Sequence, residues 1–349
     1  MRLIRTIAIQ ACLCLALAGC GPDTHSVRER GIIEYATLLG ISDSCNVQIA
    51  NPWKSDALLQ EFTIDRAFEK VIVSTNSLAA LFSELGIAKK IAGVSEPEYI
   101  SDSTIQAMVR DGRIADCGSG MYPNVERIMD LAPDAIFISP FEGGNYSQLE
   151  KLGIPLIQCA DYMETSPLGR AEWIRLYGRL MGVEAKADSL FLNIRDRYME
   201  LCSLAATTQE CPKVMLDTRS GSAWYTAGGN STIGITLSDA GARYAFSHRQ
   251  ESGSIPVSFE TVLEQAHDSD IWLLKNNTEH TMTYALLESD FGGYARFRPF
   301  IEKRIWVCDV YRTPYFEETA FHPERLLSDY IAIMHPSTGL KARYYHPLD

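Results

Sequence analysis

The sequence lacks the short patterns that mark common enzyme sites. It has no G-x-S-x-G nucleophile turn, no H-E-x-x-H zinc motif, no glycine-rich phosphate loop and no dinucleotide fingerprint. An excess of basic residues is also missing, because the formal net charge is −12. This balance argues against a nucleic-acid partner, which would be bound through clusters of Lys and Arg. Together these absences favour a binding protein over an enzyme.

Long apolar runs are missing after the first residues, so no later segment reaches the roughly 20 residues of a transmembrane helix. Arg2 and Arg5 precede an apolar run at 7–17, which is followed by L-A-G-C ending at Cys20. This order is typical of an export signal, with a retained membrane helix as the alternative. The L-A-G-C box resembles the bacterial lipobox, whose cysteine receives a diacylglycerol after cleavage. We therefore expect residues 1–19 to be removed and the protein to be anchored through Cys20 to a periplasmic membrane face.

Cysteine pairs at metal-binding spacing are missing too. No two cysteines form a C-x-x-C pattern, which argues against a structural zinc site. Cys117, Cys159 and Cys308 end or follow apolar runs, so we predict that they are buried thiols. Cys202 and Cys211 lie close enough in sequence for a disulfide, and the exported compartment permits one. The sequence alone does not decide between the bridge and free thiols.

Short apolar runs alternate with helical patterns along most of the chain, which predicts parallel sheets covered by helices. This alternation stops near residue 166 and resumes beyond residue 212. Between the two halves, one long helix is predicted at 184–206. Its apolar residues recur every three or four positions, so it packs on one side only; they are Ala187, Leu190, Ile194, Tyr198 and Leu201. We expect a lipidated tether with N-terminal strands at 20–64, an N-terminal lobe at 65–183, the linker helix, and a C-terminal lobe at 207–349.

Aromatic residues gather in the loops that follow predicted strands in both halves. Such loops line the ligand crevice beyond the carboxyl ends of the strands in open α/β sheets. We therefore predict a ligand cleft between the lobes, with Arg312 as a polar anchor among flat apolar faces. The predicted aromatic contacts are Tyr99, Tyr122, Phe141, Trp224, Tyr225 and Tyr311. Each of these rings has packing in the core or at the rim as its alternative role.

Several segments between residues 65 and 340 resemble the periplasmic substrate-binding proteins of ABC importers for iron complexes and cobalamin. They are R-A-F-E-K-V-I-V-S-T, G-V-S-E-P-E-Y, P-N-V-E-R-I-M-D-L-A-P-D-A-I-F-I-S-P and I-P-V-S-F-E-T-V-L. The stretch A-D-Y-M-E-T-S-P-L-G-R-A-E-W-I at 160–174 resembles a lipoprotein subgroup usually described as iron-complex binders. The resemblance implies two α/β lobes joined by one rigid helix, with little movement on ligand binding. It also implies one permease-docking glutamate on each lobe, at Glu126 and Glu260, although a glutamate in a first helical turn is favourable in any helix.

We therefore expect a monomer that captures a metal chelate (a ferric siderophore, haem or a corrinoid) and delivers it to an ABC permease driven by a cytoplasmic ATPase. No resident cofactor is expected. A catecholate siderophore would favour several convergent arginines, for which only Arg219, Arg249 and Arg312 are candidates. One alternative is a receptor for a bare metal ion, held by His280, His322 and a glutamate. A lipid-anchored hydrolase is the other, and it would require a nucleophile and a base to meet in the cleft.

Overall fold

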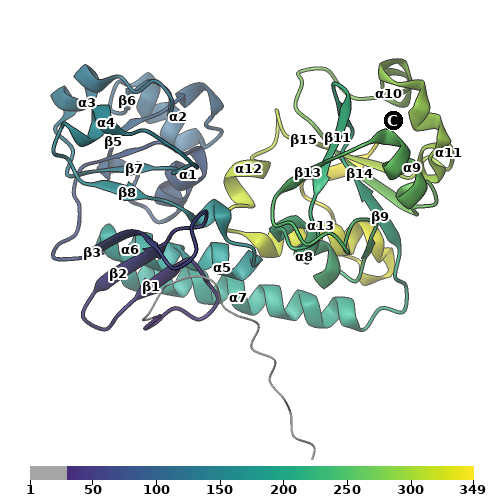
Figure 1. Cartoon of the computed structure of the whole chain (residues 1–349), viewed down its shortest axis with the longest axis horizontal. Coiled ribbons are helices and arrows are strands. Elements are labelled where there is room, and N and C mark those ends of the chain that lie inside the picture. Colours follow the sequence, from purple (N-terminus) through teal and green to yellow (C-terminus); the bar gives the residue numbers. More distant parts are fainter. Residues whose placement is uncertain (1–29) are drawn as a thin grey trace, which may run out of the picture.

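The computed structural model describes residues 30–349 and places them in two α/β lobes (Figure 1). The expected export signal and Cys20 lie outside the described residues. Helix α7 (Glu184–Ala206) runs along one side of both lobes and joins them. The predicted fold class, two α/β lobes with a single linker helix, is confirmed. One residue of the predicted apolar stripe on α7 differs in the structure. Phe191 is buried in place of Leu190, which is half-buried.

The N-terminal lobe is built on a parallel sheet with the strand order β6-β5-β4-β7-β8. Its strands are short apolar runs because helices cover both faces of a parallel sheet. The strands are β4 (Val71–Val73), β5 (Ile91–Val94), β6 (Ala115–Asp116), β7 (Ala135–Ile138) and β8 (Leu156–Gln158). The helices are α1 (Asn76–Glu84), α2 (Ser103–Arg110), α3 (Val125–Leu131), α4 (Ser147–Glu150), α5 (Pro167–Glu172) and α6 (Ile174–Leu180).

The C-terminal lobe repeats this plan with the strand order β12-β9-β14-β15-β16, in which only β16 is antiparallel to its neighbour. The strands are β9 (Lys213–Leu216), β12 (Arg243–Tyr244), β14 (Ile271–Asn276), β15 (Ile305–Asp309) and β16 (Tyr345–Pro347). The helices are α8 (Thr232–Asp239), α9 (Phe259–Ala266), α10 (Tyr284–Asp290), α11 (Arg298–Ile301), α12 (Tyr315–Glu318) and α13 (Pro323–Met334). A separate antiparallel sheet, which the sequence did not predict, contains β10 (Arg219–Ser220), β11 (Ala223–Ala227) and β13 (Ser254–Val257).

A small antiparallel sheet at the start of the described chain packs beside the N-terminal lobe (Figure 1). It consists of β1 (Leu39–Ile41), β2 (Asn46–Ala50) and β3 (Leu58–Thr63). The Gln60 side chain on β3 donates to the carbonyl of Leu156 at 2.6 Å and accepts from the backbone N–H of Gln158 at 2.9 Å. These bonds cover the exposed edge of β8, where unpaired strand groups would otherwise invite aggregation.

Two buried carboxylates hold the segment that leads into β1. Glu172 is fully buried and accepts hydrogen bonds from the backbone N–H groups of residues 34–36 at 2.7 to 2.9 Å. Glu164 accepts from the backbone N–H groups of residues 37 and 38 and from the indole of Trp173. Both glutamates belong to the 160–174 stretch, so that motif clamps residues 34–38 to the N-terminal lobe. The bonds also compensate for the burial of the carboxylates.

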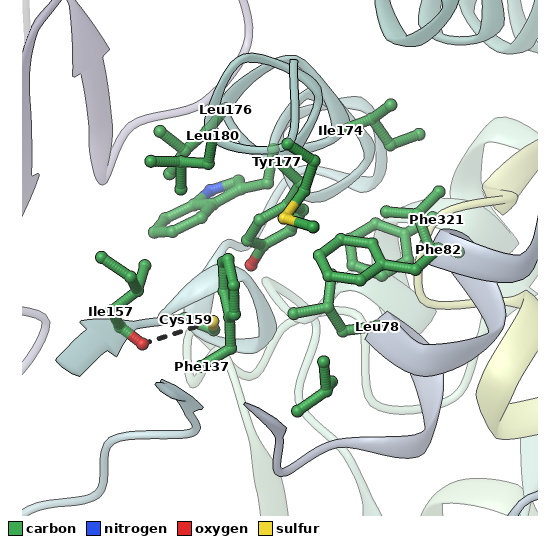
Figure 2. Close-up of a cluster of buried hydrophobic side chains, with 14 of the residues drawn as sticks. Leu78, Phe82, Phe137, Ile157, Cys159, Ile174, Leu176, Tyr177, Leu180 and Phe321 are labelled. Atoms are coloured by element: carbon green, nitrogen blue, oxygen red, sulfur yellow. Dashed lines mark hydrogen bonds between the residues drawn. The ribbon is translucent and has the colours of Figure 1, made fainter. Parts of the chain in front are cut away.

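A second junction between the lobes lies between α12 and α13. Phe321 belongs to the C-terminal half of the chain but is buried in the core of the N-terminal lobe. Figure 2 shows its ring beside Phe82 and Tyr177, and the Phe321 and Tyr177 ring centroids lie 5.8 Å apart. In return, Leu168 of α5 is part of the C-terminal core. The lobes are therefore connected twice, by helix α7 and by the packing of Phe321 and Leu168 into the opposite lobe. Two connections resist the large hinge motion of domains that are joined by one flexible link.

The cysteines of the described chain are all free thiols. Cys117, Cys159 and Cys308 are buried, as predicted, and the bridge that the sequence left open between Cys202 and Cys211 is not formed. Burial raises the pKa of the Cys117 thiol to about 11, which makes it unreactive at neutral pH. Within residues 30–349, no helix combines the length and the apolar character needed to cross a bilayer.

His322 links the two lobes electrostatically at the second junction. Its Nε2 lies 2.7 Å from a Glu84 carboxylate oxygen on α1, and its Nδ1 lies 2.9 Å from Glu324 on α13. Burial lowers the pKa of this imidazole, but the hydrogen bonds to Glu324 and Glu84 outweigh burial, so its pKa is raised. Because both ring nitrogens face carboxylates, the protonated imidazolium satisfies both contacts.

The His322 contacts are expected to make stability depend on pH. A raised histidine pKa gives a contribution that is complete below the unfolded value near 6.5 and is lost as pH rises through the folded pKa. Urea unfolding from about pH 6 to about pH 9 should therefore show that the stability difference between wild type and His322→Gln shrinks toward higher pH. His267→Gln, at an exposed histidine, is the control. A difference that stays constant with pH would refute the imidazolium assignment.

Candidate ligand cleft

A hollow of about 240 Å³ lies where the carboxyl ends of the two main sheets face each other. From the N-terminal lobe it is lined by residues that follow β4 and β5, and from the C-terminal lobe by residues that follow β14 and β15. The lining residues are Asn76, Tyr99, Ser101, Asn277, Val310, Tyr311, Thr313, Pro314, Phe316 and Glu317. The crevice beyond the carboxyl ends of parallel strands is the usual ligand position in such sheets. We refer to this hollow as the cleft.

Three aromatic rings stand exposed in the cleft and come from both lobes. Tyr99 is 66% exposed, Tyr311 is 58% exposed and Phe316 is 56% exposed. The carbonyl of Tyr99 accepts a hydrogen bond of 3.3 Å from the Asn76 side chain. The Tyr311 hydroxyl donates to Glu279 at 2.7 Å, and this bond raises the pKa of Tyr311. The three rings therefore offer large apolar faces to solvent, and a hydrogen bond orients the ring of Tyr311.

A second, more polar hollow of about 460 Å³ adjoins the cleft and shares Ser101, Pro314 and Glu317 with it. Its charged lining residues carry both signs, and they are Glu84, Asp102, Arg312, Glu317, Glu318, His322 and Arg325. The backbone N–H of Ser101 donates to the Glu317 carboxylate, which links the lobes again. Burial raises the pKa of Glu317. Glu84, Glu318, His322 and Arg325 form ion pairs with one another, so this hollow extends the junction between the lobes.

A third hollow of about 400 Å³ lies within the N-terminal lobe, at the ends of β4, β5 and β7. It contains Tyr122 and Phe141 of the predicted contacts, together with Met121, Tyr146 and Tyr162. The last three were not predicted. Tyr162 follows β8, so the rule that selected residues after strand ends would have found it.

The predicted contacts therefore divide between different sites. The structure brings Tyr99 and Tyr311 together in the cleft and places Tyr122 and Phe141 in the hollow of the N-terminal lobe. Tyr225 is exposed on β11 but lines neither the cleft nor the hollow of the N-terminal lobe. Phe316 lines the cleft although it was not among the predicted contacts.

Trp224 corrects the sequence prediction. It is fully buried, stacks on Trp272 with ring centroids 5.7 Å apart, and donates its indole N–H to the carbonyl of Leu216 at 2.9 Å. Successive side chains of a strand point to opposite faces, so only one of the neighbours Trp224 and Tyr225 can face solvent. Trp224 is therefore a core residue of the C-terminal lobe and no ligand contact.

The candidate arginines already have protein partners. Arg312 donates to the carbonyl of Glu279 at 2.7 Å and to the hydroxyl of Thr281 at 3.4 Å. The guanidinium of Arg219 lies 4.0 Å from the centre of the Phe291 ring, and Arg249 forms an ion pair with Glu251 at 2.5 Å. These guanidinium groups do not converge as a free cationic cage.

The histidines proposed for a bare metal ion are not brought together. His280 is exposed in the loop after β14, whereas His322 is buried at the junction between Glu84 and Glu324. Among residues 30–349, no group of three or more His, Cys, Asp or Glu side chains is placed to hold a metal ion.

Glu126 and Glu260 occupy equivalent positions in the two lobes. Each is the second residue of a helix, α3 or α9, whose first turn is capped by the side chain of Asn124 or Ser258. Both glutamates are exposed, and neither carboxylate has a hydrogen-bond or ion-pair partner within the described residues. Figure 1 shows both helices on the side of the lobes away from α7. Each lobe thus presents one exposed carboxylate in the first turn of a helix.

Comparison with known proteins gives one family match. The profile described as "Periplasmic binding protein" matches residues 71–305. An uncharacterized lipoprotein of Methanocaldococcus jannaschii is 27% identical over 308 residues, which span 84% of this chain and 72% of the relative. A cobalamin-binding protein of Halobacterium salinarum is 27% identical over 228 residues, but the match spans only 58% of that protein and 64% of this chain.

Solved structures share the fold at lower sequence identity. A periplasmic haem-binding protein from Pseudomonas aeruginosa superposes with a TM-score of 0.62 at 19% identity. The superposition covers 81% of this chain and 98% of that protein. At this identity the likeness concerns the fold, including the two lobes and the helix between them.

Proposed function

Because the chain belongs to the periplasmic binding protein family, we propose that it captures a flat metal chelate of the corrinoid class and delivers it to an ABC importer permease. The observation that carries this proposal is the set of exposed rings, Tyr99, Tyr311 and Phe316, which face one cleft from both lobes. Exposed aromatic rings at such density are typical of sites for large apolar surfaces. A macrocycle would cover rings that the free protein leaves in water.

Within the described part of the chain, the cleft lining contains no basic residue, which supports an uncharged or weakly charged chelate; Glu317 is the one charged residue in it. Arg219, Arg249 and Arg312 all have partners within the protein, so a strongly anionic catecholate would have to break those contacts. Corrinoids carry neutral amide groups at their periphery, which serine, asparagine and backbone groups can bind. The relative from Halobacterium salinarum, a cobalamin-binding protein, is consistent with this choice. No observation favours a hydrolase or a receptor for a bare metal ion.

The cleft proposal predicts that loss of either tyrosine ring weakens binding. Tyr99→Ala and Tyr311→Ala should each cost about 2 kcal/mol, or roughly thirtyfold in affinity, because each truncates an aromatic anchor at the centre of the site. Calorimetric titration with cyanocobalamin measures the loss. Met199→Ala removes an exposed apolar side chain of α7 and should leave the affinity unchanged. Unchanged affinity in both tyrosine variants would place the ligand elsewhere.

We also propose that the mature protein is held in the periplasm by a lipid on Cys20. The lipobox-like sequence and the lipoprotein relative support this anchor. Cys20→Ala should release the protein into the soluble periplasmic fraction, because the acyl chains would be its only insertion into the bilayer. Immunoblots of membrane and soluble fractions after a salt wash measure the shift. A variant that still sediments with membranes would contradict the lipid anchor.

Glu126 and Glu260 are proposed to dock the loaded protein on the permease. Their exposure, their lack of partners and their equivalent positions on the two lobes support this role. Two such contacts, one on each lobe, would orient the cleft over the translocation path.

A further inference from the structure

The hollow in the N-terminal lobe has a floor made almost entirely of aliphatic side chains. Its sheet face is covered by α3 and α4, which have seven and four residues and are too short to close it. The floor residues are each at most 5% exposed and form a small cluster separate from the main core. They are Ile72, Ile128, Ile136, Ile138 and Leu149.

The rim of this hollow is polar but almost uncharged. Ser74, Ser95 and Ser139 each come directly after a strand, and their half-buried hydroxyl groups have no hydrogen-bond partner within residues 30–349. The Tyr146 hydroxyl donates to the carbonyl of Ser139 at 3.1 Å. Glu96 is the one charged residue in the lining. Because these hydroxyl groups keep access to solvent and have no protein partner, they are available to a ligand that displaces water from the hollow.

The hollow lies next to the cleft in sequence and in space. Ser74 lines the hollow and Asn76 lines the cleft, while Glu96 lines the hollow and Tyr99 lines the cleft. A short side group of a ligand bound between the lobes would therefore reach the hollow.

We propose that this hollow binds a flat, uncharged bicyclic base that the chelate carries as an arm. The aliphatic floor suits the faces of such a ring, and the three serine hydroxyl groups suit its ring nitrogens and the atoms that join it to the chelate. The volume of about 400 Å³ exceeds the roughly 150 Å³ of an apolar cavity that holds benzene, so a two-ring system fits. The inference rests on the proposed corrinoid function. In it, the N-terminal lobe recognises the bicyclic base that the chelate carries.

Two corrinoids that differ in the arm test this assignment. Cyanocobalamin carries a benzimidazole arm and dicyanocobinamide lacks it. The wild-type protein should bind cyanocobalamin at least about tenfold more tightly, because only that ligand fills the apolar hollow. Ser95→Phe, which fills the hollow, should reduce the cyanocobalamin affinity to that of dicyanocobinamide and leave the dicyanocobinamide affinity unchanged.

Ser103→Phe is the matched control, because Ser103 is exposed at the start of α2 outside the hollow. Ser139→Leu is a second filling variant, and thermal unfolding of all three variants verifies that they fold. Equal affinity of the wild type for both corrinoids would overturn the assignment of the hollow alone. An equal loss for both ligands in the folded filling variants would overturn it as well. Failure of the wild type to bind either corrinoid would overturn the proposed function itself.

Discussion

Replacing Glu126 and Glu260 together by alanine is expected to abolish ligand uptake by cells while leaving ligand capture by the purified protein unchanged. Each carboxylate would meet a guanidinium group of the permease, and loss of one partner from such a contact costs about 2–5 kcal/mol. Two losses should weaken docking at least about a hundredfold. Both residues lie away from the cleft lining, so the dissociation constant of the chelate should not change. Uptake of radiolabelled cyanocobalamin and calorimetry on the purified variant measure the two effects.

The controls for this experiment use other exposed glutamates. Glu150→Ala with Glu288→Ala removes one exposed carboxylate from each lobe, and uptake should stay at the wild-type rate. Reversal of Glu126 and Glu260 to lysine should be more severe than alanine, because like charges would then face each other. Import at the wild-type rate by the double alanine variant would show that these glutamates are ordinary helix-start residues.

Glu172→Ala is expected to lower the free energy of unfolding by about 3–5 kcal/mol. The change would leave the backbone N–H groups of residues 34–36 without acceptors and remove the carboxylate that lies 3.3 Å from Arg175. Buried donors without partners bear the full cost of their lost hydration. Urea unfolding gives the magnitude, and hydrogen exchange should show that residues 34–38 lose protection first.

Glu200→Ala is the control for the Glu172 experiment. Glu200 forms an exposed ion pair of 3.1 Å with Arg197 on α7, and such pairs contribute about 0.5 kcal/mol or less. If Glu172→Ala were no more destabilising than this control, the clamp would not hold the N-terminal segment in solution.

The fold was largely predictable because its signals are local. The 23-residue helix α7 was predicted with its observed bounds, since apolar residues at helical spacing extend along most of its length. The antiparallel sheet of β10, β11 and β13 was missed because β10 has only two residues and β11 pairs with β13 about 30 residues later in the chain. The role of the 160–174 stretch was also hidden, because the partners of Glu164 and Glu172 lie 126 to 138 residues earlier.

The candidate site was predictable only in part. Tyr99 and Tyr311 follow strands of different lobes, and the structure places both in the lining of one hollow, as the rule that ligands bind at strand ends led us to expect. The same rule failed for Trp224 because the alternation within β11 places this ring in the core. It could not separate the cleft from the hollow that holds Tyr122 and Phe141, since that division depends on how α3 and α4 cover the sheet.

Calorimetric titration of the purified protein with cyanocobalamin, haemin, a ferric hydroxamate and a ferric catecholate would identify its ligand class. The exposed rings of Tyr99, Tyr311 and Phe316, together with the engaged arginines, predict one bound cyanocobalamin per chain with a Kd of about 1 μM or lower. They also predict no binding of the ferric catecholate. Tight binding of the catecholate without binding of cyanocobalamin would contradict the proposed corrinoid function.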